Sequence, residues 1–290
     1  DGYWSRGLGD VYKRQVHGIH KQVWDPDLVD IIMIRENTEG LYHSLLRRME
    51  QRALGKKDEP IVIEEFPGLE GEVAWDPRPI SRSGSERVIR FAFDYAKVRQ
   101  RKSGKPQSVT CVDKSNVTRG CQLFRKIFRE FADSNQDIPV KEAYIDAFTM
   151  WLVRNPEDLD IVVLPNMFGD IATDLASVLQ GGMGMSASAN MGPRHMLFEP
   201  VHGSAPKHAG KNIVNPIAMI QSVQMMFEAL GFRKKDETLD ICAEILQNAI
   251  RQHFEEGAPV TYDLGGTAST SDVGEAIAER CARMLKARFS

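Results

Sequence analysis

The sequence DIVVLPNMFGDIATDLAS, residues 160–177, joins a run of four apolar residues to a segment whose apolar residues recur at helical spacing. A short apolar run is typical of a strand buried on both faces, and a helix directly after it indicates a largely parallel sheet covered by helices. Asp170 and Asp174 lie four residues apart on this predicted helix, so they share a face and their like charges repel. Either both acids are solvated near the helix N-terminus, or a cation lies between them.

Strand and helix patterns alternate on the N-terminal side of this stretch. The apolar runs at residues 28–35 and 108–112 predict strands, and residues 83–98 and 121–133 predict helices with one apolar face. This alternation predicts an α/β fold with a substantially parallel sheet.

Helix boundaries follow from capping residues. Ser83 or Ser85 is expected to cap the first predicted helix. Towards the C-terminus we expect a helix from Ile217 closed by Gly231, a helix over residues 239–254, and a final helix.

Changes of composition and periodicity along the sequence predict a leader and two domains. Residues 1–15 have no amphipathic period and are expected to be a non-native leader, such as a library adapter. We assign residues 16–180 to a small domain, with a charged excursion at about 45–79, and residues 181–290 to the C-terminal part of a larger domain. The Gly-, Ser- and Ala-rich residues 181–192 are expected to cross between the two domains.

Composition argues against several classes of protein. The formal net charge is −3, with 37 basic and 40 acidic residues mixed along the chain, so no basic stripe favours nucleic acid or anionic membrane. No apolar run approaches the roughly 18 residues that span a bilayer. The four cysteines are widely spaced, which argues against a disulfide framework or a zinc site. We expect a cytoplasmic protein.

Polar residues that follow predicted strands are the candidates for a site, because ligands bind at the carboxyl ends of parallel strands. Two aspartates with room for waters suit Mg²⁺ or Mn²⁺, and Asp146 is a possible third ligand or a surface acid. Lys114 is either a solvated lysine or a proton-transfer group beside a metal. Arg35 is either a surface arginine or a fork for a carboxylate. Tyr42 is by default a partly buried aromatic residue.

The loop HGSAPKHAGKNIVNP, residues 202–216, combines small residues with Lys207, His208 and Lys211. It is either a polar surface loop or a site for a phosphate-bearing ligand, since small residues let the backbone approach a ligand. The segment GGMGMS, residues 181–186, lacks the third glycine of a G-x-G-x-x-G fingerprint, which argues against a Rossmann site.

Taken together and in order, these stretches resemble the metal-dependent β-decarboxylating dehydrogenases, the isocitrate/isopropylmalate dehydrogenase family. The resemblance runs from about residue 25 to the C-terminus and is carried by the motifs IRENTEGLY, DKSNV, IDA, PNMFGDIATDLAS, SASANMG, FEPVHGSAPKHAGK, NPIAMI and TYDLGG. It implies a two-domain isopropylmalate/isocitrate dehydrogenase-like fold, an oxidoreductase acting on a small hydroxy acid, and a homodimer with shared active sites.

The resemblance also implies roles for individual residues. Asp170 and Asp174 would bind Mg²⁺ or Mn²⁺ in one subunit, with Asp146 reaching in from the partner. Lys114, also from the partner, would be the base for the substrate hydroxyl. Tyr42 would be the acid that protonates the enol, and Arg35 would bind the malate carboxylate.

For the nucleotide, the resemblance implies a site at the HGSAP loop. The expected cofactor-binding residues are Glu199, His202, Gly203, Ser204, Ala205, Lys207, His208, Val214 and Asn215. NAD-specific members carry an acid directly after HGSAP, whereas this chain has two basic residues there, so we favour NADP over NAD. The DLGG turn, however, lacks the arginine that some NADP-using isocitrate enzymes supply.

Two departures from the family leave the substrate open. The N-terminal part of the family's larger domain is expected to be missing, and with it the loop that recognises the substrate side chain. The excursion at 45–79 is longer than in compact members and is expected to form a dimer clasp. The activity expected is 3-isopropylmalate dehydrogenase-like, with isocitrate (NADP), homoisocitrate or tartrate dehydrogenase as alternatives. A non-catalytic regulatory subunit of a hetero-oligomer is the alternative from another class.

Overall fold

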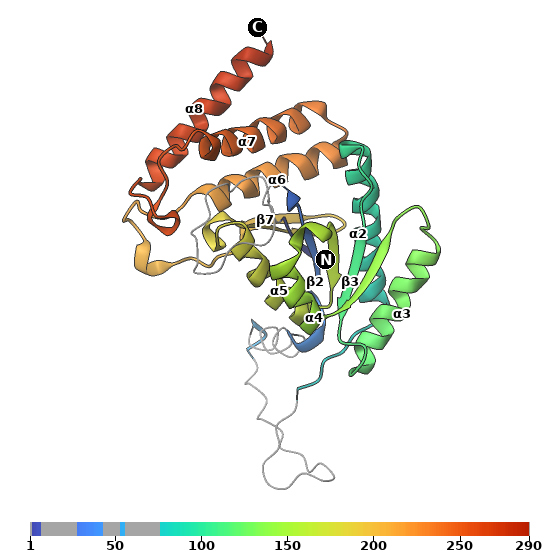
Figure 1. Cartoon of the computed structure of the whole chain (residues 1–290). Helices are drawn as coiled ribbons and strands as arrows, with labels where there is room; N and C mark the ends of the chain where they lie inside the picture. The colour runs from blue at the N-terminus through green and yellow to red at the C-terminus, as the bar shows by residue number, and fades with distance from the viewer. Residues whose placement is uncertain (1, 7–27, 43–52, 56–75, 290) are drawn as a thin grey trace.

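The computed structural model describes residues 2–6, 28–42, 53–55 and 76–289 (Figure 1). The predicted excursion at 45–79 therefore lies almost entirely outside the described residues. None of the helices in the described part of the chain is both long and apolar enough to cross a bilayer.

The described strands form one sheet with the order β4-β3-β5-β2-β1-β6-β7. Its parallel part contains β2 (Ile32–Glu36), β3 (Val109–Asp113), β4 (Val140–Tyr144) and β5 (Ile161–Leu164). The antiparallel part contains β1 (Gly2–Arg6), β6 (Ala187–Met191) and β7 (Met196–Pro200). The prediction of a mixed α/β fold with a parallel sheet is confirmed.

Successive residues of a strand point to opposite faces, and this alternation divides the core in two. Ile32 and Ile34 face the helices α2 (Arg82–Ser103) and α3 (Arg119–Asp133), whereas Met33 faces α4 (Ile145–Arg154) and α5 (Asn166–Leu179). Phe93, Phe124, Phe128 and Phe148 are the largest buried side chains of these two clusters. The two helix pairs therefore cover opposite faces of the parallel strands (Figure 1).

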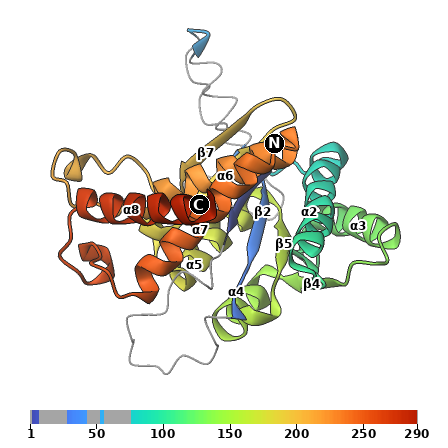
Figure 2. The same ribbon diagram turned by 90° about the horizontal axis from the view of Figure 1, so that it is seen from above.

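A third layer follows the sheet in sequence. It consists of α6 (Ile217–Lys234), α7 (Glu237–Glu255) and α8 (Thr270–Phe289), with α6 packed on β6 and β7. Figure 1 shows these helices above the sheet, and Figure 2 looks down onto them. Met185, Ile217, Ile250 and Ile277 belong to the small core that they share.

Two predicted details differ from the structure. The first described helix is capped by Ser81, whose hydroxyl accepts the Gly84 N–H at 3.0 Å, and not by Ser83 or Ser85. Gly231 does not close α6, since the helix continues to Lys234. A side chain at Gly231 would lie 3.1 Å from the backbone of Asp240, so the glycine lets α7 start close against α6.

Two predicted segments take part in the sheet. Residues 181–192, expected to cross between domains, include the short 3₁₀ helix η4 (Met183–Met185) and strand β6. Residues 2–6 of the expected leader form β1, which pairs antiparallel with both β2 and β6. The domain boundary near residue 180 and the origin of the leader stay predictions.

Candidate active site

Asp170 lies in the first turns of α5, directly after the buried strand β5. One of its carboxylate oxygens accepts a hydrogen bond from Arg35 Nη1 at 2.6 Å, and the other accepts one from Tyr42 Oη at 2.5 Å. Arg35 also donates to Asn166 Oδ1 from Nε at 3.0 Å and from Nη2 at 2.6 Å. The guanidinium lies 5.4 Å from the Tyr42 ring centroid. Three of the predicted site residues, Arg35, Tyr42 and Asp170, thus form one cluster with Asn166. We call these four residues the Asp170 cluster.

The local sequence allows Arg35 to reach this position. The arginine is the fourth residue of β2, and its aliphatic stem crosses the first turn of α5 at Gly169. A β-carbon at Gly169 would lie 2.5 Å from Arg35 Cγ, so only glycine leaves room for the arginine to pass. Tyr42 is brought in by the short 3₁₀ helix η2 (Gly40–Tyr42) after the same strand.

The Asp170 cluster borders a cavity of about 440 Å³, which is also lined by Asp174 and by residues at the end of β7. The hydrogen bond to Asp170, together with burial, raises the pKa of Tyr42 above its ordinary value. Its hydroxyl is therefore protonated at neutral pH and can act as a proton donor. Asp170 keeps 44% of its side chain exposed despite its two partners, so its oxygens remain accessible from the cavity.

Lys114 and Asp146 form a second group, which we call the Lys114 pair. Lys114 follows β3, Asp146 lies in the first turn of α4, and the lysine ammonium donates to Asp146 Oδ1 at 2.6 Å. This hydrogen bond lowers the pKa of Asp146. The ammonium also lies 5.9 Å from the centroid of the Tyr144 ring. Asp146 keeps 65% of its side chain exposed, so the pair faces away from the core.

A single chain does not bring all three predicted metal ligands together. Asp170 and Asp174 border one cavity, whereas Asp146 is bonded to Lys114 and does not line that cavity. Over the residues that the structure describes, no three His, Cys, Asp or Glu side chains are close enough to hold a metal ion. Asp170 and Asp174 do supply the hard oxygen donors, open to a cavity, that Mg²⁺ and Mn²⁺ prefer.

The loop after β7 forms the wall of a second cavity of about 600 Å³. Most of the predicted cofactor-binding residues line it, namely His202, Gly203, Ser204, Ala205, His208, Val214 and Asn215. The backbone of Ala205 adopts the left-handed region with φ of 43°, a conformation that costs energy for a residue with a side chain. This cost indicates that the path of the loop is imposed by its surroundings.

Two predicted cofactor-binding residues do not line this second cavity. Glu199 lines the cavity of the Asp170 cluster instead, where its carboxylate accepts a hydrogen bond from Asn190 at 3.1 Å. Lys207 is exposed in the 3₁₀ helix η5 (Pro206–His208) next to the cavity. The roles assigned to these residues stay predictions.

The structure adds residues that the sequence pattern did not single out. Tyr262 and Asp263 of η6 (Tyr262–Leu264) line the second cavity together with Thr270. The Tyr262 ring stacks on His208, with 6.1 Å between ring centroids. Asp263 accepts a hydrogen bond from Asn215 at 3.0 Å. The DLGG motif marked this turn, but motif order alone does not show that its side chains meet the HGSAP loop.

The two cavities are neighbours, because Met183, His202 and Gly203 line both of them. A ligand in the larger cavity would therefore lie next to one held by Arg35, Asp170 and Asp174. A site with two adjoining cavities, one with charged groups and one with small residues, can hold two reactants in contact.

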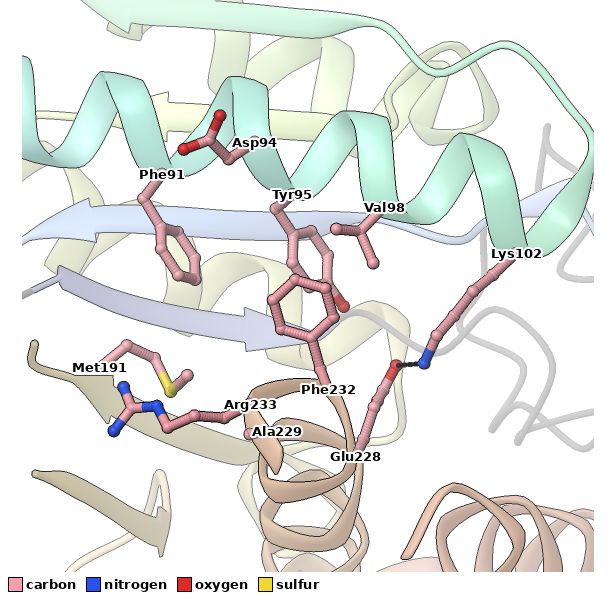
Figure 3. A pocket seen from close by; sticks show the side chains of 10 residues that line it. All are labelled: Phe91, Asp94, Tyr95, Val98, Lys102, Met191, Glu228, Ala229, Phe232 and Arg233. Carbon is pink, nitrogen blue, oxygen red and sulfur yellow. Dashed lines mark ion pairs between the residues drawn. The ribbon is translucent and has the colours of Figure 1, made fainter. Parts of the chain in front are cut away.

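Another cavity, of about 270 Å³, lies between α2 and α6 (Figure 3). Its walls are mainly apolar, with Phe91 and Tyr95 from α2 opposite Phe232 from α6, and an ion pair of Lys102 with Glu228 at its edge. None of the candidate residues lines it.

Comparison with known proteins supports the sequence resemblance. A sequence model described as isocitrate/isopropylmalate dehydrogenase matches residues 11–277. The chain is 39% identical to a homoisocitrate dehydrogenase of Methanocaldococcus jannaschii over 259 residues, which are 89% of this chain and 65% of the relative. It is also 39% identical to a 3-isopropylmalate dehydrogenase of Archaeoglobus fulgidus over 251 residues, or 86% of this chain and 67% of that relative.

A solved structure gives the same result. The isocitrate dehydrogenase from Methylococcus capsulatus superimposes with a TM-score of 0.75 at 34% identity, covering 97% of this chain and 73% of the other. The chain thus spans about two thirds of the length of the curated relatives that it matches.

Proposed function

The chain belongs to the isocitrate/isopropylmalate dehydrogenase family, and we propose that it acts in the NAD(P)-dependent oxidation and decarboxylation of a 3-substituted malate. The activity proposed is 3-isopropylmalate dehydrogenase-like, because relatives of that name are 36–39% identical over most of the chain. The observation that carries the proposal is the adjoining pair of cavities. One presents an arginine and two aspartates, and the other is walled by the HGSAP loop.

The residues of the first cavity suit a hydroxy acid with several carboxylates. Arg35 lines this cavity, and its planar guanidinium would bind a substrate carboxylate by exchanging its present contacts with Asn166 and Asp170. Asp170 and Asp174 fit Mg²⁺ or Mn²⁺, which when bound would supply a Lewis acid that favours loss of the hydroxyl proton and stabilises charge on that oxygen. A bound cation would also relieve the electrostatic repulsion between the two aspartates.

Two groups of the chain have the proton chemistry that the reaction needs. Lys114, as the neutral amine, would take the proton of the substrate hydroxyl, and a nicotinamide nucleotide held in the adjoining cavity would supply the hydride acceptor. After CO₂ leaves, Tyr42 would return a proton to carbon, and the raised pKa of its hydroxyl keeps that proton available at neutral pH.

Shared sites in a homodimer explain how the Lys114 pair would meet the Asp170 cluster. Helices α4 and α5 carry apolar side chains that a single chain leaves exposed, including Trp151 at 40%, Met150 at 52%, Ile171 at 54% and Val178 at 65%. Ile171 and Val178 are two turns apart on one face of α5. Exposed apolar stripes of this kind mark association surfaces, and α4 also carries Asp146. A partner docked here would receive the lysine and the third aspartate.

The choice of NADP over NAD is the finer part of the proposal. His208 lines the larger cavity and Lys207 lies beside it, so a ligand there meets positive charge from Lys207 where an acid would repel a 2′-phosphate. The η6 turn does not add to this positive charge, since its residues Tyr262 and Asp263 line the cavity without supplying a cation.

The test is an assay of the full-length gene product with Mg²⁺ and either NADP⁺ or NAD⁺. The substrates are 3-isopropylmalate, isocitrate, homoisocitrate and tartrate. We expect turnover of one of them, best 3-isopropylmalate, with NADP⁺ preferred and with activity lost in Asp170→Asn. A folded dimer that binds nucleotide but turns over none of these substrates would instead favour the regulatory subunit.

A further inference from the structure

We propose that Arg125 is a positioning residue that fixes Lys114 and Asp146 relative to each other from beneath the protein surface. The inference rests on the proposed function, which gives these two residues their roles. Arg125 belongs to α3, a helix that contributes none of the candidate site residues. Its guanidinium lies where the turn after β3 meets the junction between β4 and α4.

The first arm of this arrangement holds the turn of Lys114. Arg125 donates from Nε and Nη2 to the two carboxylate oxygens of Asp113, at 2.9 and 2.8 Å. Asp113 is fully buried and directly precedes Lys114. Its Oδ1 also accepts the backbone N–H of Ser115 at 2.8 Å. The buried carboxylate therefore fixes the backbone on both sides of the lysine.

The second arm holds the start of α4. Arg125 Nη2 donates to the carbonyl oxygen of Ala143 at 2.7 Å, three residues before Asp146. The guanidinium also lies 4.9 Å from the centroid of the Tyr144 ring, and the Lys114 ammonium lies 5.9 Å from the centroid of the same ring. One buried group thus contacts both segments that carry the Lys114 pair.

The exposed ion pair alone would not hold this geometry. Solvent-exposed pairs contribute little to stability, and Asp146 is largely exposed. A two-pronged guanidinium–carboxylate contact in a buried setting has far more directional constraint. Displacement of a reacting group by about 1 Å can cost on the order of 100-fold in rate. The buried contact is therefore where we expect the position of Lys114 to be set.

The variant Arg125→Lys tests this inference in the full-length protein, because it keeps the charge and removes the two-pronged contact. We expect kcat to fall at least about ten-fold while the KM of the nucleotide stays unchanged, since the HGSAP cavity lies elsewhere. Arg129→Lys is the matched control. Arg129 also comes from α3 and binds Glu142, but it is exposed and touches neither Asp113 nor Ala143, so its kcat should stay at the wild-type value.

Heterodimers isolated through two affinity tags show whether Arg125→Lys impairs only the site that receives its own Lys114 or damages the whole subunit. In the proposed dimer, Asp170 acts in its own subunit's site and Lys114 in the partner's. A heterodimer of Arg125→Lys with Asp170→Asn then has one intact site of two, with about half of the wild-type activity. A heterodimer of Arg125→Lys with Lys114→Met has no intact site and should stay at or below the activity of the Arg125→Lys homodimer.

The outcomes distinguish a failure of the positioning inference from a failure of the proposed function. Wild-type kcat in Arg125→Lys, or a loss of activity that Asp170→Asn cannot complement, would overturn the positioning inference. The reference heterodimer of Lys114→Met with Asp170→Asn reports on the shared site by itself. If that reference stays inactive while both homodimers fold, the arrangement in the proposed function is wrong, and kcat of the Arg125→Lys homodimer still decides whether Arg125 positions the lysine. If Arg125→Lys does not fold, the double variant Arg125→Gln with Asp113→Asn takes its place, because it removes the two-pronged contact and leaves no uncompensated buried charge.

Discussion

The Asp170 cluster and the Lys114 pair both follow parallel strands, yet they are held in opposite ways. In the Asp170 cluster the functional groups bind one another around an open cavity: Asp170 is satisfied by Arg35 and Tyr42. In the Lys114 pair Asp146 is exposed and Lys114 is partly buried, and a buried ion pair of Arg125 with Asp113 supports them from behind. One region can exchange its partners for a ligand, whereas the other presents side chains from a fixed base.

This difference separates the residues that bind from the residues that support. Substitutions at Tyr42 and Asp170 of the Asp170 cluster should change activity and have small effects on stability, because these two side chains are partly exposed. Substitutions in the base of the Lys114 pair should change stability first. The predictions below test this contrast, in order of decreasing effect.

The largest effect is expected for Asp113→Asn. Removing one partner of a buried ion pair leaves an uncompensated charge, and such changes typically cost about 3–5 kcal/mol. Denaturant unfolding monitored by circular dichroism measures the change. Asp133→Asn, at an exposed position at the end of α3, is the control and should stay within about 0.5 kcal/mol of the wild type. Equal stability of the two variants would show that the buried ion pair does not make the base of the Lys114 pair a structural support.

Tyr42→Phe should lower kcat without unfolding the protein. Loss of a positioned general acid typically costs about 100-fold or more in rate, and Tyr42 is only partly buried, so loss of its hydroxyl should disturb the packing little. Steady-state kinetics under saturating substrate, together with the melting temperature, give both quantities. A kcat of Tyr42→Phe within about two-fold of the wild-type value would show that Tyr42 is not the general acid of the proposed mechanism.

Lys207→Glu should reverse part of the nucleotide preference. An acid at this exposed position would repel a 2′-phosphate, and a change of about 1.4 kcal/mol corresponds to ten-fold in relative kcat/KM. The ratio of kcat/KM for NADP⁺ to that for NAD⁺ is the measurement, with Lys211→Glu as the matched control in the same loop. An unchanged ratio would show that Lys207 does not contribute to the choice of nucleotide.

Asp174→Asn should leave stability within about 0.5 kcal/mol of the wild type, because Asp174 is exposed and its neighbour four residues away has the same charge. The same denaturant unfolding used for Asp113→Asn gives the comparison. Destabilisation as large as that of Asp113→Asn would mean that the cavity wall beside the Asp170 cluster also contributes strongly to stability.

Much of the fold could be predicted because apolar runs and helical periodicity carry the signal. β2, β3, β5 and the helices after them have such patterns. β4 was not predicted, since its sequence VKEAY is mostly polar and partly exposed at the edge of the sheet. β7 was hidden in the same way by the mixed pattern MLFEP. Strands of this kind form because a neighbouring strand offers hydrogen bonds, which the local sequence does not record.

The candidate site was predicted as a set of residues but not as a geometry. Motif order identified Arg35, Tyr42 and Asp170, and the structure brings these three together. The contact of Arg125 with Asp113 was not predicted, because a buried arginine on an amphipathic helix looks like a residue of the solvated face. Both the geometry of the Asp170 cluster and the burial of Arg125 depend on tertiary contacts between segments that are far apart in sequence.

The central claim is that Asp170 and Asp174 from one chain and Asp146 from another hold one metal ion. Calorimetric titration of Mn²⁺ into the wild-type dimer and into Asp146→Asn tests it most directly, with Asp133→Asn as the matched control. We predict that Asp146→Asn weakens Mn²⁺ binding by at least about ten-fold while the control binds as the wild type does. Wild-type affinity in Asp146→Asn would show that the Lys114 pair does not belong to the metal site.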